Sequence, residues 1–140
     1  MPHVPERAPR CVPSRNSTCV GRHLLADMYG VDASALGDAD TLRDQLTAAL
    51  RTAGFHIIEQ HTHRFPGAPS GVTAFVLLSE SHAAVHTYPE HEYLALDVFS
   101  CGPADPRRVL DALCQYLRPR SVDLVEQTRG DLDKVKMHAD

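Results

Sequence analysis

The hydrophobic and polar positions of this chain follow two periods, and these periods predict its elements. Successive side chains of a strand point to opposite faces, so alternation every second residue, or a short dense apolar run, predicts a strand. In the clearest case, Leu94, Leu96 and Val98 share one face while polar and aromatic residues share the other. The same reasoning predicts strands at residues 22–29, 55–65, 72–78, 82–88, 93–101 and 121–126.

Two further segments repeat their apolar positions every three or four residues, which is typical of a helix with one buried face. The first spans the apolar positions 42–53, follows the N-cap candidates Asp38 and Asp40, and ends at Gly54. Glycine suits a helix end because it adopts the left-handed conformation without strain. The second lies within 105–119, beginning with an Asp-Pro pair and ending at a proline.

The predicted order is therefore β-α-β-β-β-β-α-β. Strands joined by short turns pair antiparallel, and two amphipathic helices can cover one face of the sheet. We predict an α+β fold, a two-layer sandwich of a mainly antiparallel sheet with two helices on one face. A half-apolar bare sheet face is normally buried, so we expect a second copy of the chain to cover the other face. That face would carry His82, His86, Tyr93, Asp97, Phe99 and Cys101.

Length and charge narrow the classes of function. A chain of 140 residues and 15.4 kDa predicts one domain, here 21–140, after a disordered Pro/Arg-rich tail at 1–20. A net charge of −4 disfavours a nucleic-acid partner. No apolar run approaches the roughly 20 residues of a membrane span. The N-terminus also lacks the apolar segment of a signal peptide, so we expect a cytoplasmic protein.

Six of the nine histidines fall between residues 56 and 91, which suggests metal or acid-base chemistry. His61 and His63 have a spacing that can chelate. His82 and His86 are four apart on a strand, about 13 Å, which is too far to share one ion. No Cys-x-x-Cys or His-Glu-x-x-His motif is present. We therefore expect no metal site, and favour solvated or interface histidines.

Two features suggest nucleophilic chemistry. A turn near Glu90 would bring His86 and Cys101 onto neighbouring strands as a reactive pair, although a packing cysteine is the simpler interpretation. The segment 79–82, Ser-Glu-Ser-His, places four polar residues between apolar strands without glycine or proline. It is either a strained peptide bond poised for attack by the Ser81 hydroxyl or a solvated polar turn.

Several segments together identify a family. Gly-Arg-His-Leu-Leu-Ala-Asp, His-Arg-Phe, Gly-Val-Thr, Leu-Ser-Glu-Ser-His-Ala-Ala-Val-His-Thr-Tyr-Pro-Glu, Asp-Val-Phe-Ser-Cys-Gly and Glu-Gln-Thr-Arg-Gly occur in that order at 21–27, 63–65, 71–73, 78–90, 97–102 and 126–130. In this order and spacing they resemble the short S-adenosylmethionine decarboxylase proenzymes of bacteria and archaea. The resemblance covers residues 21 to about 130.

The resemblance implies a pyruvoyl enzyme that cleaves itself between Glu80 and Ser81. Decarboxylation of an amino acid needs an electron sink that no coded side chain provides. The Ser81 hydroxyl would attack the Glu80 carbonyl to give an ester. Elimination and hydrolysis would then leave a pyruvoyl group at residue 81, with a β chain 1–80 and an α chain 81–140. The substrate amine would form a Schiff base with this group.

The resemblance also implies the roles of individual residues. His86 matches the histidine that acts as general acid and base during processing, and Thr73 stands where many relatives have an assisting serine. Cys101 matches the cysteine that protonates the substrate α-carbon after carbon dioxide leaves. Ser81 itself supplies the pyruvoyl cofactor, and no metal is required.

For the substrate, the resemblance implies S-adenosylmethionine and a product used in spermidine synthesis. Glu90 matches a glutamate that binds the ribose hydroxyls, while Phe65 and Tyr88 are candidates to stack on adenine or face the sulfonium. Relatives form (αβ)₂ dimers with the sites at the interface. Two alternatives stay open: a pyruvoyl-dependent decarboxylase of ornithine or arginine, and an uncleaved regulatory homologue.

Overall fold

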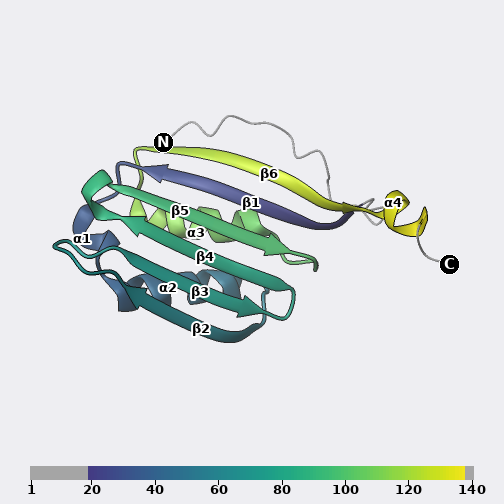
Figure 1. The fold of residues 1–140 in the computed structure, drawn as a ribbon, viewed down its shortest axis with the longest axis horizontal. Helices are drawn as coiled ribbons and strands as arrows, with labels where there is room; N and C mark the ends of the chain where they lie inside the picture. Colours follow the sequence, from purple (N-terminus) through teal and green to yellow (C-terminus); the bar gives the residue numbers. More distant parts are fainter. Residues whose placement is uncertain (1–18, 138–140) are drawn as a thin grey trace.

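The alternating segments pair into one antiparallel sheet in the computed structural model, which describes residues 19–137. The strand order across the sheet is β2-β3-β4-β5-β1-β6, and every neighbouring pair is antiparallel (Figure 1). An α+β fold built on an antiparallel sheet is thereby confirmed. The strands are β1 (Cys19–Tyr29), β2 (Ile57–Arg64), β3 (Val72–Leu78), β4 (Ser81–Tyr88), β5 (Tyr93–Ser100) and β6 (Ser121–Asp131).

The two long helices lie behind the sheet in the view of Figure 1. α2 (Ala39–Thr52) contacts β2 and β3, while α3 (Pro106–Leu117) contacts β1 and β5. Asp38 caps α2 by accepting a hydrogen bond from the Thr41 N–H at 3.1 Å, and Asp105 caps α3 in the same manner. Both helices therefore begin directly after the capping residues that the sequence analysis identified.

The core lies between the helices and the sheet. In β5, Leu94, Leu96 and Val98 are fully buried on the helix side, whereas Tyr93 and Asp97 on the other face are only partly buried. This is the division of faces predicted from the alternation. We refer to the face turned away from α2 and α3 as the outer face.

The ends of several elements differ from the prediction. β1 begins at Cys19, so its first two residues fall within the segment 1–20 predicted as a tail, and residues 1–18 lie outside the described part of the chain. β6 continues to Asp131 rather than 126, because Cys19 pairs with Asp131 and extends the ladder. Such pairing depends on a distant strand and leaves no local signal.

Three short elements were not predicted: α1 (Ala33–Leu36), a 3-10 helix η1 (Pro89–His91) and α4 (Leu132–Met137). The described residues therefore form four α-helices where the sequence predicted two. Within residues 19–137, no helix has the length and apolar character needed to cross a membrane.

A buried hydroxyl links three elements and allows a test of stability. Thr87 on β4 donates to the Leu36 carbonyl and accepts from the Val72 N–H, both at 2.8 Å. Thr87→Val keeps the shape but leaves both partners unsatisfied, so we expect a loss of about 1–3 kcal/mol in the free energy of unfolding. Urea unfolding measures this loss. Thr62→Val, on the exposed strand β2, is the control, and equal midpoints for the two variants would contradict the prediction.

Candidate active site

The turn between β3 and β4 contains the residue pair at which cleavage is expected. Leu78 pairs with Ser81 across this turn, so the Glu80–Ser81 peptide bond lies at its exit. Ser81 has a φ of 146°, a conformation that residues with a side chain rarely adopt and that persists only where the surroundings enforce it. Of the two interpretations of this segment, the observed φ favours the strained backbone.

Two donors from Cys101 hold the carbonyl oxygen of Glu80. The Cys101 N–H nitrogen lies 3.0 Å from this oxygen, and the thiol Sγ lies 2.9 Å from it. The register explains the contact, because Ser81 pairs with Ser100 at the end of β5, and Cys101, the residue after β5, then faces Glu80. Two donors directed at one carbonyl oxygen stabilise negative charge that develops there.

The side chain of Glu80 is also held in place. Its carboxylate accepts a hydrogen bond from the His56 N–H at 3.3 Å and lies 3.2 Å from His56 Nδ1. Burial acts to raise the pKa of Glu80, but hydrogen bonds from Ser79 and His56 outweigh it and lower the pKa. A Cβ on Gly102 would lie 2.9 Å from the Glu80 Cγ, so a side chain at this position would displace the Glu80 side chain. Sequence reasoning did not identify His56, since nothing in its spacing relates it to Glu80.

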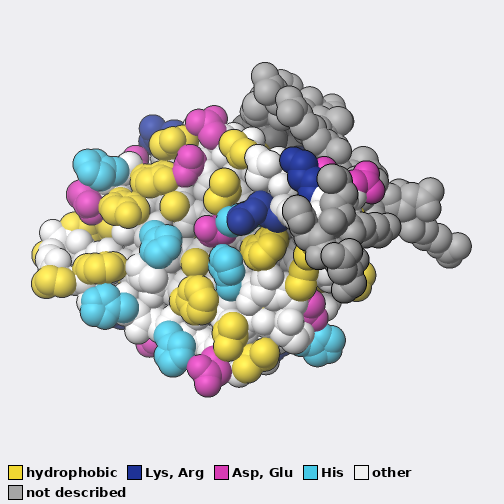
Figure 2. All heavy atoms as spheres, turned by 45° about the vertical axis from the view of Figure 1, so that its right-hand side comes forward, with side chains coloured by type: hydrophobic (Ala, Val, Ile, Leu, Met, Phe, Trp, Pro, Cys, Tyr) yellow, Lys and Arg dark blue, Asp and Glu magenta, His cyan; other side chains and the backbone are white. Residues whose placement is uncertain are grey.

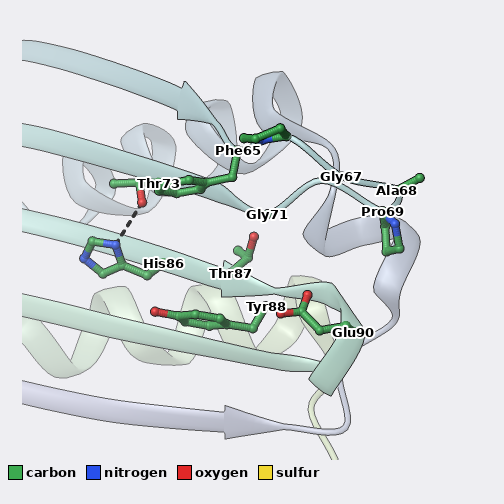
Figure 3. A pocket seen from close by; sticks show the side chains of 11 residues that line it. Phe65, Gly67, Ala68, Pro69, Gly71, Thr73, His86, Thr87, Tyr88 and Glu90 are labelled. Carbon is green, nitrogen blue, oxygen red and sulfur yellow. Dashed lines mark hydrogen bonds between the residues drawn. The ribbon is translucent and has the colours of Figure 1, made fainter.

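A pocket of about 510 Å³ lies at the opposite end of β4 (Figure 3). The predicted substrate residues Phe65, Tyr88 and Glu90 line it, together with Thr73 and His86. Thr73 Oγ1 and His86 Nδ1 are 2.9 Å apart, and Figure 3 shows the two side chains pointing toward one another. Five of the residues predicted from the resemblance therefore share one pocket.

Three tyrosines form a stacked row that sequence reasoning missed. Tyr93 lies between Tyr29 and Tyr88, with ring centroids 5.4 Å apart and rings 19° from parallel on each side. The Tyr93 hydroxyl donates to Asp27 at 2.5 Å. Burial, followed by this contact with Asp27, raises the pKa of Tyr93. Since Tyr88 lines the pocket, the row supports one wall of it.

The reactive pair of His86 and Cys101, considered as the alternative to a packing cysteine, does not form within one chain. The turn does lie near Glu90, but its register pairs His86 with Ala95 and leaves Cys101 beyond the Ser81–Ser100 pair. His86 and Ser81 are five residues apart on β4, about 17 Å at the usual rise per residue. The bond at which cleavage is expected and the histidine expected to act in processing thus lie toward opposite ends of the same strand.

Among the described residues, His61 and His63 belong to no group of three or more side chains whose ligand atoms lie close together. His61 and His63 lie on the exposed edge strand β2, and His61 Nε2 is 3.2 Å from its neighbour Glu59. Within residues 19–137, the three side chains whose ligand atoms all lie within 4.8 Å of one another are His23, His82 and Asp97. They come from three different strands, so spacing along the chain could not have indicated them.

Comparisons with known proteins agree with this geometry. The sequence profile described as S-adenosylmethionine decarboxylase matches residues 22–130. The S-adenosylmethionine decarboxylase proenzyme of Aquifex aeolicus (strain VF5) is 37% identical over 116 residues, 82% of this chain and 84% of that protein. The proenzyme of Methanococcus maripaludis (strain C5 / ATCC BAA-1333) is 35% identical over 120 residues, 84% of this chain and 97% of that protein.

A solved structure agrees as well. The crystal structure of the adenosylmethionine decarboxylase from Aquifex aeolicus VF5 superposes with a TM-score of 0.73 at 37% identity, covering 81% of this chain and 92% of that one. The profile match includes both the turn at Glu80 and Ser81 and the pocket, and these relatives each span most of the chain. The chain therefore belongs to the S-adenosylmethionine decarboxylase family.

Proposed function

We propose that this chain is the precursor of a pyruvoyl-dependent enzyme that decarboxylates S-adenosylmethionine, giving the aminopropyl donor for spermidine synthesis. The precursor cleaves itself between Glu80 and Ser81. The observation that carries the proposal is the geometry on both sides of this peptide bond. Ser81 has a φ of 146°, and the Glu80 carbonyl oxygen faces two donors from Cys101. A cytoplasmic location stays a prediction from the sequence.

The first step is an acyl shift within the chain. The Ser81 Oγ attacks the Glu80 carbonyl carbon, and the negative charge that develops on the carbonyl oxygen is stabilised by the Cys101 N–H and thiol. Collapse breaks the C–N bond and leaves an ester between Glu80 and the Ser81 oxygen, with a free amine on residue 81. A strained ground state at Ser81 lowers the barrier to this shift, because the shift releases the strain.

The second step needs a base at the Ser81 Cα. Loss of that proton expels the Glu80 carboxylate and leaves dehydroalanine, which water converts to a pyruvoyl group and ammonia. His86 is the proposed base, oriented by Thr73 at 2.9 Å. Since His86 of the same chain is about 17 Å away along β4, we infer that the His86 of a second copy acts at each Ser81.

The outer face supports this (αβ)₂ arrangement. Figure 2, which views the face obliquely, shows hydrophobic and histidine side chains side by side over it. Phe75 and Tyr88, on β3 and β4, are 40% and 42% exposed. A sheet face of this composition is normally buried, and a twofold pairing would bring the cleavage turn of one copy to the pocket of the other.

In turnover, the chain's own residues bind the substrate and move one proton. The pyruvoyl group, when formed, supplies the electron sink for decarboxylation. Glu90 accepts hydrogen bonds from the ribose hydroxyls, and Phe65 and Tyr88 stack on the adenine or face the sulfonium. Cys101, beside residue 81, donates the proton to the α-carbon after carbon dioxide has left.

The direct test combines mass and carbon dioxide release. Intact-mass spectrometry of the pure protein should show two chains in place of the 15.4 kDa precursor. Carboxyl-labelled S-adenosylmethionine should then release labelled carbon dioxide, whereas labelled ornithine and arginine should not. Release from ornithine or arginine alone would overturn the substrate assignment. A precursor that stays intact after long incubation would favour the uncleaved regulatory homologue.

Mixing two inactive chains tests the shared site. Ser81→Ala lacks the nucleophile and His86→Ala lacks the base, so neither should cleave efficiently alone. When they are co-expressed, the mixed dimer has one complete site, formed by Ser81 of the His86→Ala chain and His86 of the other. We expect cleavage of the His86→Ala chain only, identified by intact mass. No cleavage in the mixture would contradict a site built from two chains.

A further inference from the structure

The ring of His82, directly after Ser81, is enclosed on the outer face by three other rings. Phe75 from β3 stacks on it with centroids 5.9 Å apart and an angle of 18°. Phe99 from β5 lies at 6.1 Å and His23 from β1 at 6.0 Å, the latter edge-on. One third of the His82 side chain stays exposed. Three strands therefore fix the side chain that follows the cleavage point.

A carboxylate completes this enclosure through a chain of polar contacts. Arg129 on β6 lies 3.2 Å from His23 Nδ1. A guanidinium can only donate, so Nδ1 accepts and the His23 proton resides on Nε2. That Nε2–H donates to Asp97, whose same carboxylate oxygen lies 3.7 Å from His82 Nε2. Phe75, Phe99, His23 and Asp97 together form what we call the His82 cage.

His82 and two members of its cage could also form a metal site, since the ligand atoms of His23, His82 and Asp97 all lie within 4.8 Å of one another. A metal on His23 Nε2 would require the ring proton on Nδ1. That proton would then face the Arg129 guanidinium, and two donors would oppose each other. The hydrogen bonds from Arg129 to His23 and from His23 to Asp97 therefore favour a polar relay beside His82 over a metal ion.

The His82 cage lies directly after Ser81, the residue with the strained backbone. An unfavourable φ persists only when the surrounding structure enforces it. On one side of Ser81, Cys101 and His56 hold Glu80. On the other side, β4 pairs His82 with Phe99, and the cage holds its ring. Phe99 itself is closely packed, because a Cβ on Gly21 would lie 2.9 Å from its ring.

We propose that the His82 cage is a positioning device, which keeps Ser81 in its strained conformation and so speeds self-cleavage. This inference rests on the proposed function. Without the cage, residue 81 relaxes toward an ordinary φ, and the population of the reactive conformer falls. A tenfold loss of rate corresponds to about 1.4 kcal/mol, which is within the range of backbone strain that such surroundings maintain.

The test follows cleavage of the full chain after cell-free synthesis, with the precursor fraction measured over time by intact mass. We expect His82→Ala to slow the first-order rate roughly tenfold. His82→Phe keeps a flat ring against Phe75 and Phe99 and should recover most of the rate. Phe75→Leu, which removes the ring that stacks on His82, should slow cleavage by about threefold. His61→Ala, an exposed histidine outside the cage, is the control and should cleave at the wild-type rate.

Each other outcome counts against the inference. Wild-type rates for both His82→Ala and Phe75→Leu would overturn it, as would a His82→Phe rate as low as that of His82→Ala. Light scattering reports the oligomeric state of every variant, and a slow rate explained by loss of the dimer would also overturn it. A wild-type chain that never cleaves would instead refute the proposed function, because there would be no self-cleavage for the His82 cage to accelerate.

Discussion

Replacing Ser81 by alanine is expected to abolish both self-cleavage and decarboxylation. The variant lacks the hydroxyl that attacks the Glu80 carbonyl, so no ester forms and no pyruvoyl group can arise from the chain. The loss should exceed roughly a thousandfold, because nucleophile and cofactor precursor are the same atoms and no neighbour replaces them. Intact mass should show one uncleaved species, and labelled S-adenosylmethionine should release no carbon dioxide above background.

Ser79→Ala is the matched control for this prediction. Ser79 lies in the same turn two residues earlier and carries the same hydroxyl, but it precedes the bond that breaks. We expect this variant to cleave to completion. Cleavage of the Ser81→Ala chain at the same bond would contradict the prediction, because the reaction would then use another nucleophile.

Replacing Cys101 by alanine should separate processing from turnover. The side chain is the proposed proton donor in decarboxylation, and loss of a general acid typically lowers the rate by about 10² to 10⁴. Processing should continue, because the variant keeps the backbone N–H that lies 3.0 Å from the Glu80 oxygen. Loss of the weaker thiol contact should slow cleavage by only about three- to tenfold. Intact mass and carbon dioxide release measure the two effects on the same sample.

Cys114→Ala is the control for the thiol. Cys114 lies on α3, where burial, followed by the neighbouring Asp111, raises its thiol pKa to about 11. It is far along the chain from the cleavage turn, and we expect normal processing and turnover. Full turnover by the Cys101→Ala enzyme would refute the role of Cys101 as proton donor. Failure of that variant to cleave would show that the thiol itself is required for processing.

The elements were predicted well where one local period decides them. In β5, alternation alone separated the buried Leu94, Leu96 and Val98 from the half-buried outer residues. The caps of α2 and α3 were found because a capping side chain bonds to a backbone N–H only a few residues away. The prediction was poorer for β6, whose last residues are strand only because the distant Cys19 pairs with Asp131.

The residues of the site were predicted as members of a family, but their grouping was not. Ser81, Cys101 and His86 were expected together, whereas the register puts Cys101 beside Glu80 and His86 opposite Ala95. The spacing of two residues along the chain predicts their distance on one strand. It does not predict which residues of a neighbouring strand they face, and a shift of one residue in register moves every side chain of a strand to the other face of the sheet.

The sequence by itself determined the fold class and the expected chemistry, because strand and helix periods are local and the Ser-Glu-Ser-His motif lies within four consecutive residues. Only the tertiary structure decided the strained φ at Ser81, the two donors on Glu80 and the cage around His82. It also separated His86 from the bond it is proposed to process, which points to a second copy. These features arise from the pairing of strands distant in sequence, where hydrogen-bond register and packing, rather than the order of residues, set the distances.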